Sequence, residues 1–298
     1  MKIRSQILAL AFVAIIAGSA ALNAQSDSQE KTGHAPAKTK VYKFRSVDYP
    51  GSWFSSAIDY EGGLVVGGTV QEESGQETGF AYHGTKYSVI AYPGSTGSEA
   101  NAISASGVIL GDYADADKVL HGFLYDGKTY TTIDPPGSTR TVLGGINESG
   151  VIVGIYTDGS GQEHGFIDTD GKFTKIDYPG SKETGATGIN AAGDIVGYFY
   201  SSDGLSHGFL LSKGSFSEMN YPSAMSTSVA SINDKGAIAG TYLDLSNIAH
   251  GFTLIDGTFS TVDLPGAQQT YLNRITNNGN LVGTVRDVKG ELHGIIGK

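Results

Sequence analysis

Short runs of β-branched and aromatic residues alternate with polar, glycine-rich turns along residues Gly144–Ser181, GGINESGVIVGIYTDGSGQEHGFIDTDGKFTKIDYPGS. In the next copy of this pattern the runs cover Ala186–Asn190, Asp194–Tyr200, Ser206–Leu211 and Ser215–Asn220. Short turn-forming connections between such runs are typical of antiparallel hairpins. No copy shows the apolar period of a helix. The pattern therefore predicts one four-stranded antiparallel sheet per copy.

The copies recur six times, with a constant period of 43 residues. Proline-led turns begin at Pro50, Pro93, Pro136, Pro179, Pro222 and Pro265, and His-Gly pairs begin at His121, His164, His207, His250 and His293. A repeated four-stranded unit of this length is typical of β-propeller blades. A β-helix or a linear solenoid is the alternative, but its coils are shorter and lack a hairpin at every junction.

The two ends of the repeat array complement each other. Tyr42–Asp48 matches the fourth strand at Gly171–Asp177, and Leu292–Lys298 matches a third strand, after which the sequence stops. Pairing these two segments would close a ring and leave no exposed sheet edge. We therefore predict an all-β fold over residues 41–298: a six-bladed β-propeller of four-stranded antiparallel blades, its ring closed by the N-terminal strand pairing with the last blade.

The first 40 residues have a different composition. Lys2 and Arg4 precede the apolar run Ile7–Ala17, and Leu22-Asn23-Ala24 ends on a small residue, which is the pattern of a signal peptide over residues 1–24. A retained membrane anchor is the alternative. Residues 25–40 contain no large hydrophobe and predict a flexible polar leader. We expect a secreted protein, extracellular or periplasmic, without membrane association after cleavage.

Charge and cysteine content exclude several kinds of partner. The net charge is −10, and it becomes −12 without residues 1–24, which carry two basic residues and no acidic one. Nucleic acids and anionic membranes both require a basic face, so neither is expected as a partner. The chain has no cysteine, which excludes disulfides and thiolate chemistry. We expect a monomer.

The repeat also has a sequence signature. The pattern Ile-Asn-x-x-Gly-x-Ile-Val-Gly-x-Tyr stands at Ile146–Tyr156, is followed by His164-Gly165-Phe166, and returns from Ile189 and from Ile232. It resembles the bacterial extracellular HAF-repeat family, and the resemblance covers residues 41–298. It implies an exported repeat protein of propeller type and brings no established reaction, so it carries over no catalytic residues. The first copy departs from the pattern, because Thr78 replaces the histidine.

Two sets of polar residues raise the question of a metal. The repeated histidines lie on separate blades and cannot converge on one ion, so we predict that each binds backbone or a carboxylate at its own hairpin. The acidic tip at Tyr156–Glu163 places oxygens on alternate residues, which suits calcium. Asp158, Ser160 and Glu163 are the candidates for such a site. No other cofactor is expected.

Residues that depart from the repeat are the candidates for ligand binding, since the repeated ones serve the fold. We expect the loops from fourth to first strands and from second to third strands to share one face and to form the binding surface. The candidates placed on this surface are Trp53, Phe54, Arg140, Lys182, Gln268, Tyr271 and Arg274. Arg274 replaces a small residue of the other copies and is expected near the central channel, as a binding group or in a salt bridge. For Trp53, packing at the ring closure is the alternative to ligand stacking.

These features favour a secreted binding module over an enzyme. The ligand would be an extracellular glycan or protein, and the aromatic and amide groups favour a glycan. The alternative is a polysaccharide hydrolase or lyase with its site at the channel mouth, using Arg274, Tyr271, Arg140 and Glu99. No carboxylate pair or nucleophile–base arrangement is visible from the spacing, which makes an enzyme the less favoured interpretation. A purely structural role in the cell envelope is a third possibility.

Overall fold

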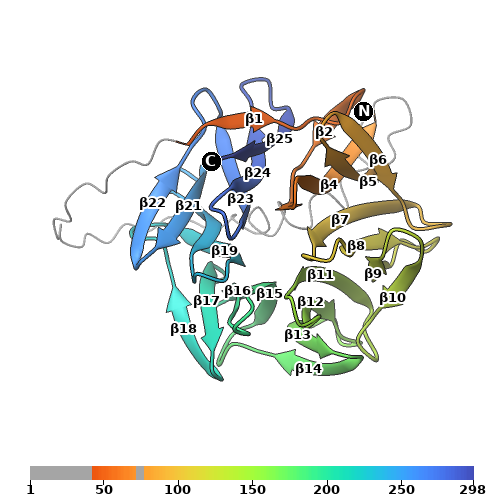
Figure 1. Cartoon of the computed structure of the whole chain (residues 1–298). Helices are drawn as coiled ribbons and strands as arrows, with labels where there is room; N and C mark the ends of the chain where they lie inside the picture. Colours follow the sequence, from red (N-terminus) through yellow and green to blue (C-terminus); the bar gives the residue numbers. More distant parts are fainter. Residues whose placement is uncertain (1–41, 72–76) are drawn as a thin grey trace.

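The computed structural model describes residues 42–71 and 77–298, and over these ranges the chain is all-β, with 25 strands and no helix. The strands form sheets arranged in a ring (Figure 1). This confirms the prediction of an all-β propeller. The predicted signal peptide and polar leader lie outside the described residues. No helix in the described ranges is long and apolar enough to span a membrane.

Four of the sheets are separate four-stranded antiparallel meanders, as the repeat predicts. The first contains β7 (Gly97–Ile103), β8 (Ile109–Ala114), β9 (Leu120–Tyr125) and β10 (Tyr130–Ile133). The second contains β11 (Arg140–Ile146), β12 (Ile152–Thr157), β13 (Glu163–Thr169) and β14 (Lys172–Ile176). The third contains β15 (Glu183–Ile189), β16 (Ile195–Tyr200), β17 (Ser206–Ser212) and β18 (Ser215–Met219). The fourth contains β19 (Ser226–Ile232), β20 (Ile238–Leu243), β21 (Ala249–Ile255) and β22 (Thr258–Val262).

The remaining strands form one nine-stranded sheet, so the prediction of six separate four-stranded blades is not met. One part contains β23 (Gln269–Ile275), β24 (Leu281–Arg286), β25 (Leu292–Gly297) and β1 (Phe44–Ser46). The other part contains β3 (Asp59–Glu61), β4 (Leu64–Gln71), β5 (Glu77–His83) and β6 (Lys86–Ile90). The linking strand is β2 (Ser52–Ser55), which pairs antiparallel with β4 and, through Phe54 and Leu292, parallel with β25.

The predicted pairing between the two ends of the chain is confirmed. Phe44 pairs with Gly297 and Ser46 with Ile295 in an antiparallel register, and β1 lies beside β25 in Figure 1. The N–H of Val47 then donates to the carbonyl of Gly294 at 2.7 Å. The Val47 side chain is only 1% exposed, so the N-terminal segment contributes to the core as well as to the sheet edge.

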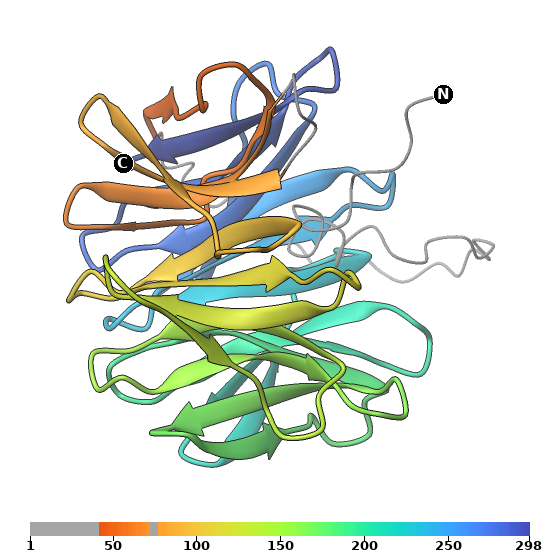
Figure 2. The ribbon, with the colours of Figure 1, turned by 90° about the vertical axis from the view of Figure 1, so that its right-hand side faces the viewer.

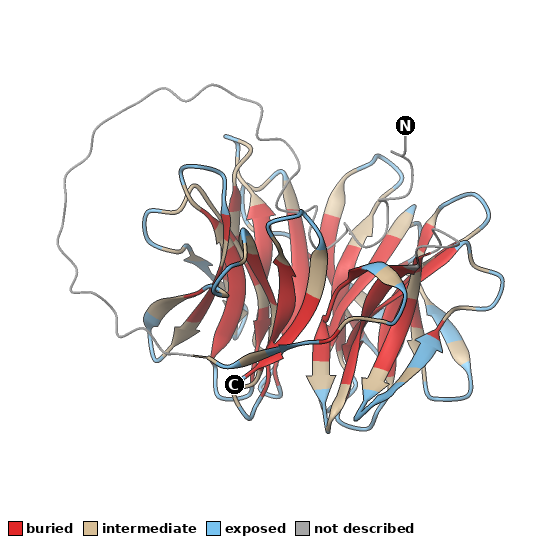
Figure 3. Cartoon of the chain, turned by 90° about the horizontal axis from the view of Figure 1, so that it is seen from above, coloured by how far each residue is buried: buried red, intermediate tan, exposed pale blue. Residues whose placement is uncertain are grey.

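The core consists of repeated apolar layers between neighbouring sheets. Phe123 of β9 packs in a cluster with Ala100 and Ile109 of its own sheet and with Ala81 and Ile90 of the preceding strands. The equivalent phenylalanines of the other four-stranded sheets also pack against the preceding repeat. Figure 3 shows the result, with buried residues in the strands and exposed residues in the loops.

The glycines of the second strands are required by close packing within their own sheets. A Cβ atom on Gly197 would lie 1.9 Å from the carbonyl oxygen of Gly185 and 2.9 Å from the ring of Phe209. Both partners belong to the same sheet, on β15 and β17. The absence of a side chain lets the phenylalanine ring of the third strand lie flat over the second strand.

The strands run between two opposite faces of the ring, where the connections gather (Figure 2). On β15, Glu183 pairs with Tyr200 at one end and Ile189 with Ile195 at the other. We call the first end the proline face, because it carries the Pro-Gly turns and the loops between second and third strands. The other end, with the turns between first and second strands, is the asparagine face.

Candidate functional site

The repeated histidines on the proline face have structural partners. His164 Nδ1 lies 2.7 Å from Asp177 Oδ1, and its Nε2 lies 3.4 Å from Asp158 Oδ2. His121 and His250 are placed in the same way between two aspartates. The prediction that each histidine binds backbone or a carboxylate at its own hairpin is confirmed at these positions, and the partner is a carboxylate. Each imidazole ties the end of a fourth strand to the loop before its own strand.

The three calcium candidates do not share an open set of ligands. Asp158 Oδ1 accepts the Ser160 hydroxyl and the backbone N–H groups of Gln162 and Ser160, which lower the pKa of this carboxyl group. The Glu163 carboxylate is bonded to other residues: it accepts the Tyr198 hydroxyl at 2.7 Å and the Arg140 guanidinium at 3.3 Å. Burial raises the pKa of Glu163, while the bonds from Tyr198 and Arg140 oppose that shift.

Trp53 and Phe54 line a pocket of about 150 Å³ at the closure of the ring, together with Asp48, Ser52, Ser55, Glu291, Leu292 and His293. Trp53 is 44% exposed, whereas Phe54 is 5% exposed. The Phe54 ring packs edge-on against the indole, with 6.1 Å between the ring centroids. His293 Nδ1 lies 3.2 Å from Asp48 Oδ2. Residues from both ends of the chain thus meet beside one exposed indole.

Lys182 lines a second pocket on the proline face, of about 260 Å³, with Gln162, His164, Asp177, Tyr178, Pro179, Gly180, Ser181 and Glu183. The pocket lies between the sheets of β11–β14 and β15–β18. The Lys182 ammonium donates to the carbonyl of Ser202 at 2.9 Å, and the Gln162 amide donates to the carbonyl of Lys182. The lysine charge is therefore held against a neighbouring loop.

The other candidates on the proline face do not line the Trp53 pocket. Arg140 begins β11 and forms the ion pair with Glu163. Tyr271 is 7% exposed and donates its hydroxyl to Gln269. Gln268 has an exposed side chain, and its backbone N–H donates to the carbonyl of Arg286 at 2.8 Å.

Arg274 lies on the asparagine face, and the prediction that it shares a face with Trp53 is wrong. It pairs with Val282, one residue before the pair Ile275–Leu281 and the turn that joins β23 to β24. Within β23 (Gln269–Ile275), Arg274 is the residue before the last, at the end of the strand far from the proline turn. Arg274 therefore marks a different site.

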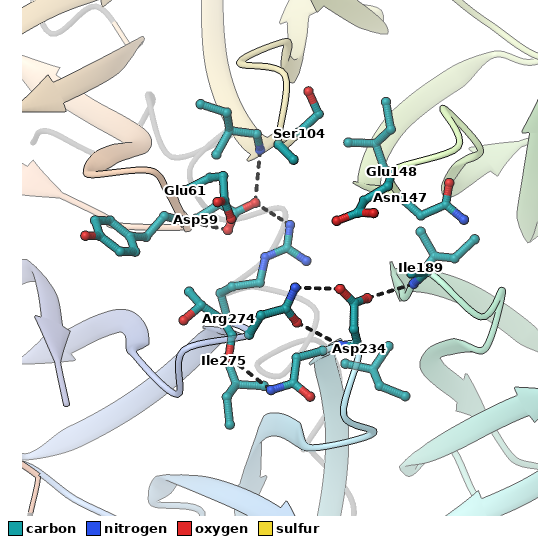
Figure 4. Close-up of a pocket in the computed structure, with 18 residues that line it drawn as sticks. Asp59, Glu61, Ser104, Asn147, Glu148, Ile189, Asp234, Arg274 and Ile275 are labelled. Atoms are coloured by element: carbon teal, nitrogen blue, oxygen red, sulfur yellow. Dashed lines mark hydrogen bonds and ion pairs between the residues drawn. The ribbon is translucent and has the colours of Figure 1, made fainter.

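Figure 4 shows Arg274 in a polar pocket of about 110 Å³ at the mouth of the central channel. Its guanidinium forms an ion pair with Asp59, whose side chain is 5% exposed. Asp59 also accepts the backbone N–H groups of Tyr60 and Ile103, at 2.7 and 2.9 Å. The sequence left two roles for Arg274, a binding group or a salt bridge, and the structure contains the salt bridge.

The sequence predicted that His293 binds backbone or a carboxylate and that the segment ending at Asp48 lies beside it, whereas Glu291 was not predicted as a pocket residue. Asp48 and His293 are 245 residues apart and meet only because the ring closes. The repeat does mark Glu291 as unusual, because the equivalent residues in three other copies are Val119, Leu205 and Ile248. A cross-strand carboxylate pair was also missed: Glu99 lies directly opposite Asp112.

No family model matches the chain, and no curated protein matches it. Solved structures do match. AofleA from Arthrobotrys oligospora has a TM-score of 0.54 at 13% identity, over 87% of this chain and 86% of its own. The fucose-specific lectin from Aleuria aurantia has a TM-score of 0.52 at 14% identity, over 82% and 92%. TolB from Acinetobacter baumannii has a TM-score of 0.57 at 10% identity, over 79% and 64%. At these identities the likeness establishes the β-propeller fold.

Proposed function

We propose that this chain is an exported glycan-binding β-propeller whose binding site is the Trp53 pocket at the closure of the ring. The observation that carries the proposal is the exposed indole of Trp53 beside a small pocket lined by both polar and apolar side chains. An aromatic face takes the C–H side of a sugar ring, while carboxylate, imidazole and hydroxyl groups bond its hydroxyls.

The polar groups of the pocket fit this role. Asp48 and Glu291 offer acceptors and Ser52 offers a hydroxyl, while His293 lies between Asp48 and Asp287 and holds the Asp48 carboxylate in place. A binding site of few polar groups around an apolar wall is the usual construction for a small polar ligand. The pocket volume of about 150 Å³ suits one sugar unit rather than a long chain.

The similar structures suggest the class of sugar to test first. The Aleuria aurantia protein is a fucose-specific lectin, which supports fucosylated glycans as the first ligands to try. We further propose that the two halves of the nine-stranded sheet act as two blades, which would make six repeats around the ring. The resemblance to the extracellular HAF-repeat family and the signal-like N-terminus support export.

The test is a glycan array enriched in fucosylated structures, followed by titration of each hit. We expect Trp53→Ala to reduce affinity at least tenfold, with the melting temperature nearly unchanged because the indole is partly exposed. Leu245→Ala is the matched control, because Leu245 is an 84% exposed hydrophobe on a loop of the same face. If the wild-type protein retains no glycan, the function is wrong. If both variants bind like the wild type, the site is wrong.

A further inference from the structure

Two acidic residues face each other inside the ring, and neither belongs to the Trp53 pocket. Glu99 of β7 and Asp112 of β8 are a directly opposed cross-strand pair, and their exposures are 2% and 0%. Directly opposed side chains in an antiparallel pair are close neighbours, so like charges there repel each other. In the other four-stranded sheets this position pair is Val142 with Ile155, Gly185 with Tyr198, and Ser228 with Thr241.

Two oxygen atoms at this place have no hydrogen-bond partner among the described residues. They are Oδ2 of Asp112 and Oδ1 of Asn101, and Asn101 is 3% exposed. The Asn101 amide nitrogen donates to Asp112 Oδ1 and to the carbonyl of Leu143, which holds the side chain beside the carboxylate. A buried oxygen without a hydrogen-bond donor lowers the stability of the folded state. A positively charged partner beside the acidic pair would remove that cost.

The surrounding charges do not supply that partner. No basic side chain in the described ranges forms an ion pair with Glu99 or Asp112. Burial raises the pKa of Asp112; the hydrogen bond from Asn101 and the nearby Arg140 oppose that shift, but the Arg140 guanidinium is in an ion pair with Glu163. Burial also raises the pKa of Glu99, and the acids Asp112 and Glu77 raise it further; Glu77 is 8% exposed.

The space around the pair is shaped by a glycine. The Glu99 carboxylate lies over Gly68 of β4, where a Cβ atom would come within 2.5 Å of Glu99 Oε1. The Ser56 hydroxyl lies 3.4 Å from the same oxygen. The Glu99 carboxylate thus reaches the neighbouring nine-stranded sheet and accepts the Ser56 hydroxyl there.

We propose that Glu99, Asp112 and Asn101 form a buried site for a hard metal cation, calcium in the first instance. All three offer oxygen ligands, which calcium prefers over nitrogen and sulfur. One cation would neutralise the opposed carboxylates, use both oxygens that lack a donor, and join the sheet of β7–β10 to the strands that close the ring. The site is independent of glycan binding.

The test is thermal unfolding of the full chain at pH 7.5 after chelation, with and without 10 mM calcium chloride. A cation that binds the folded state and not the unfolded state raises the melting temperature. The rise is about 5 °C when calcium is a hundredfold above its dissociation constant. We expect this rise in the wild type and in Asp117→Asn, a control that removes an exposed acid. Asp112→Asn and Glu99→Gln should lose the rise and still fold, because each relieves the repulsion in the pair.

Each alternative gives a different result. If calcium leaves the wild-type melting temperature unchanged, the pair holds a proton instead of a cation and the proposal is wrong. If Asp112→Asn and Glu99→Gln keep the full rise, calcium binds elsewhere, for example at the surface group Asp287, Glu291 and His293, and the proposal is again wrong. Loss of glycan binding in the Trp53 variant has no bearing on either outcome.

Discussion

Replacing Arg274 by methionine should destabilise the ring more than any ordinary surface substitution. The change keeps most of the apolar stem and removes the guanidinium from its ion pair with Asp59. The two side chains are 13% and 5% exposed, so solvent screens the pair only slightly. The pair joins β23 and β3, which are 215 residues apart, across the closure of the ring.

The size of the destabilisation depends on the Asp59 carboxylate, which stays buried after Arg274 is replaced. Removing one partner of a buried ion pair costs about 3–5 kcal/mol, because the other charge stays buried without compensation. Asp59 would retain the N–H groups of Tyr60 and Ile103, which hold part of its charge. We therefore expect a loss near the lower end, about 3 kcal/mol, which corresponds to a fall of about 6–12 °C in melting temperature.

The assay is urea unfolding followed by tryptophan fluorescence, with circular dichroism as a second probe. Lys175→Met is the matched control, because Lys175 forms an ion pair with Asp177 whose side chains are 52% and 40% exposed. Exposed pairs contribute little, so this variant should show no measurable loss. The double variant Arg274→Met with Asp59→Asn should recover part of the stability: no buried charge then lacks a partner, but the new amide has one acceptor oxygen for the two N–H groups of Tyr60 and Ile103. A loss below about 1 kcal/mol for Arg274→Met would refute the reasoning.

Two further predictions concern the sheets. Gly197→Ala should cost at least about 3 kcal/mol, because its Cβ would overlap the Gly185 carbonyl, whereas Gly159→Ala, with no atom within 4 Å, should be neutral in the same unfolding assay. In chelated buffer, stability should fall as the pH rises from 4 through about 6, because burial raises the pKa of Asp112 to about 6 and the folded state then holds a proton that the unfolded state has released. Asp112→Asn should flatten this dependence, and an unchanged slope would contradict the assignment.

The repeat allowed the strands and turns to be predicted closely, because each position is sampled several times along one chain. The turn predicted at Asn190–Gly193 is present: Gly193 has a φ of +81° and donates its N–H to the Asn190 carbonyl. The pairing of the chain ends followed from a strand missing at one end and spare at the other. These inferences needed only local pattern and counting.

The merging of two repeats into one sheet could not be predicted in the same way. It depends on β2, where Phe54 pairs with Leu292 far along the chain. The first copy spaces its turn differently, with Gly62 and Gly63 after the short strand β3. An irregular copy signals that something differs, but one example gives no pattern from which to infer the new pairing.

The pairing of Glu99 with Asp112 is the clearest example of a contact that the repeat pattern could not predict. The pairs Ile103–Ile109 and Ala102–Leu110 set a register that, continued along a regular hairpin, would place Glu99 opposite Tyr113. A register shift between Ala100 and Ala102 moves Glu99 opposite Asp112 instead, and brings Asn101 to the same carboxylate. The same shift occurs at the equivalent place in three other four-stranded sheets and on β23. Because the shift inserts no residue that breaks the period, the sequence pattern conceals it, and with it the opposition of two charges that defines the proposed cation site.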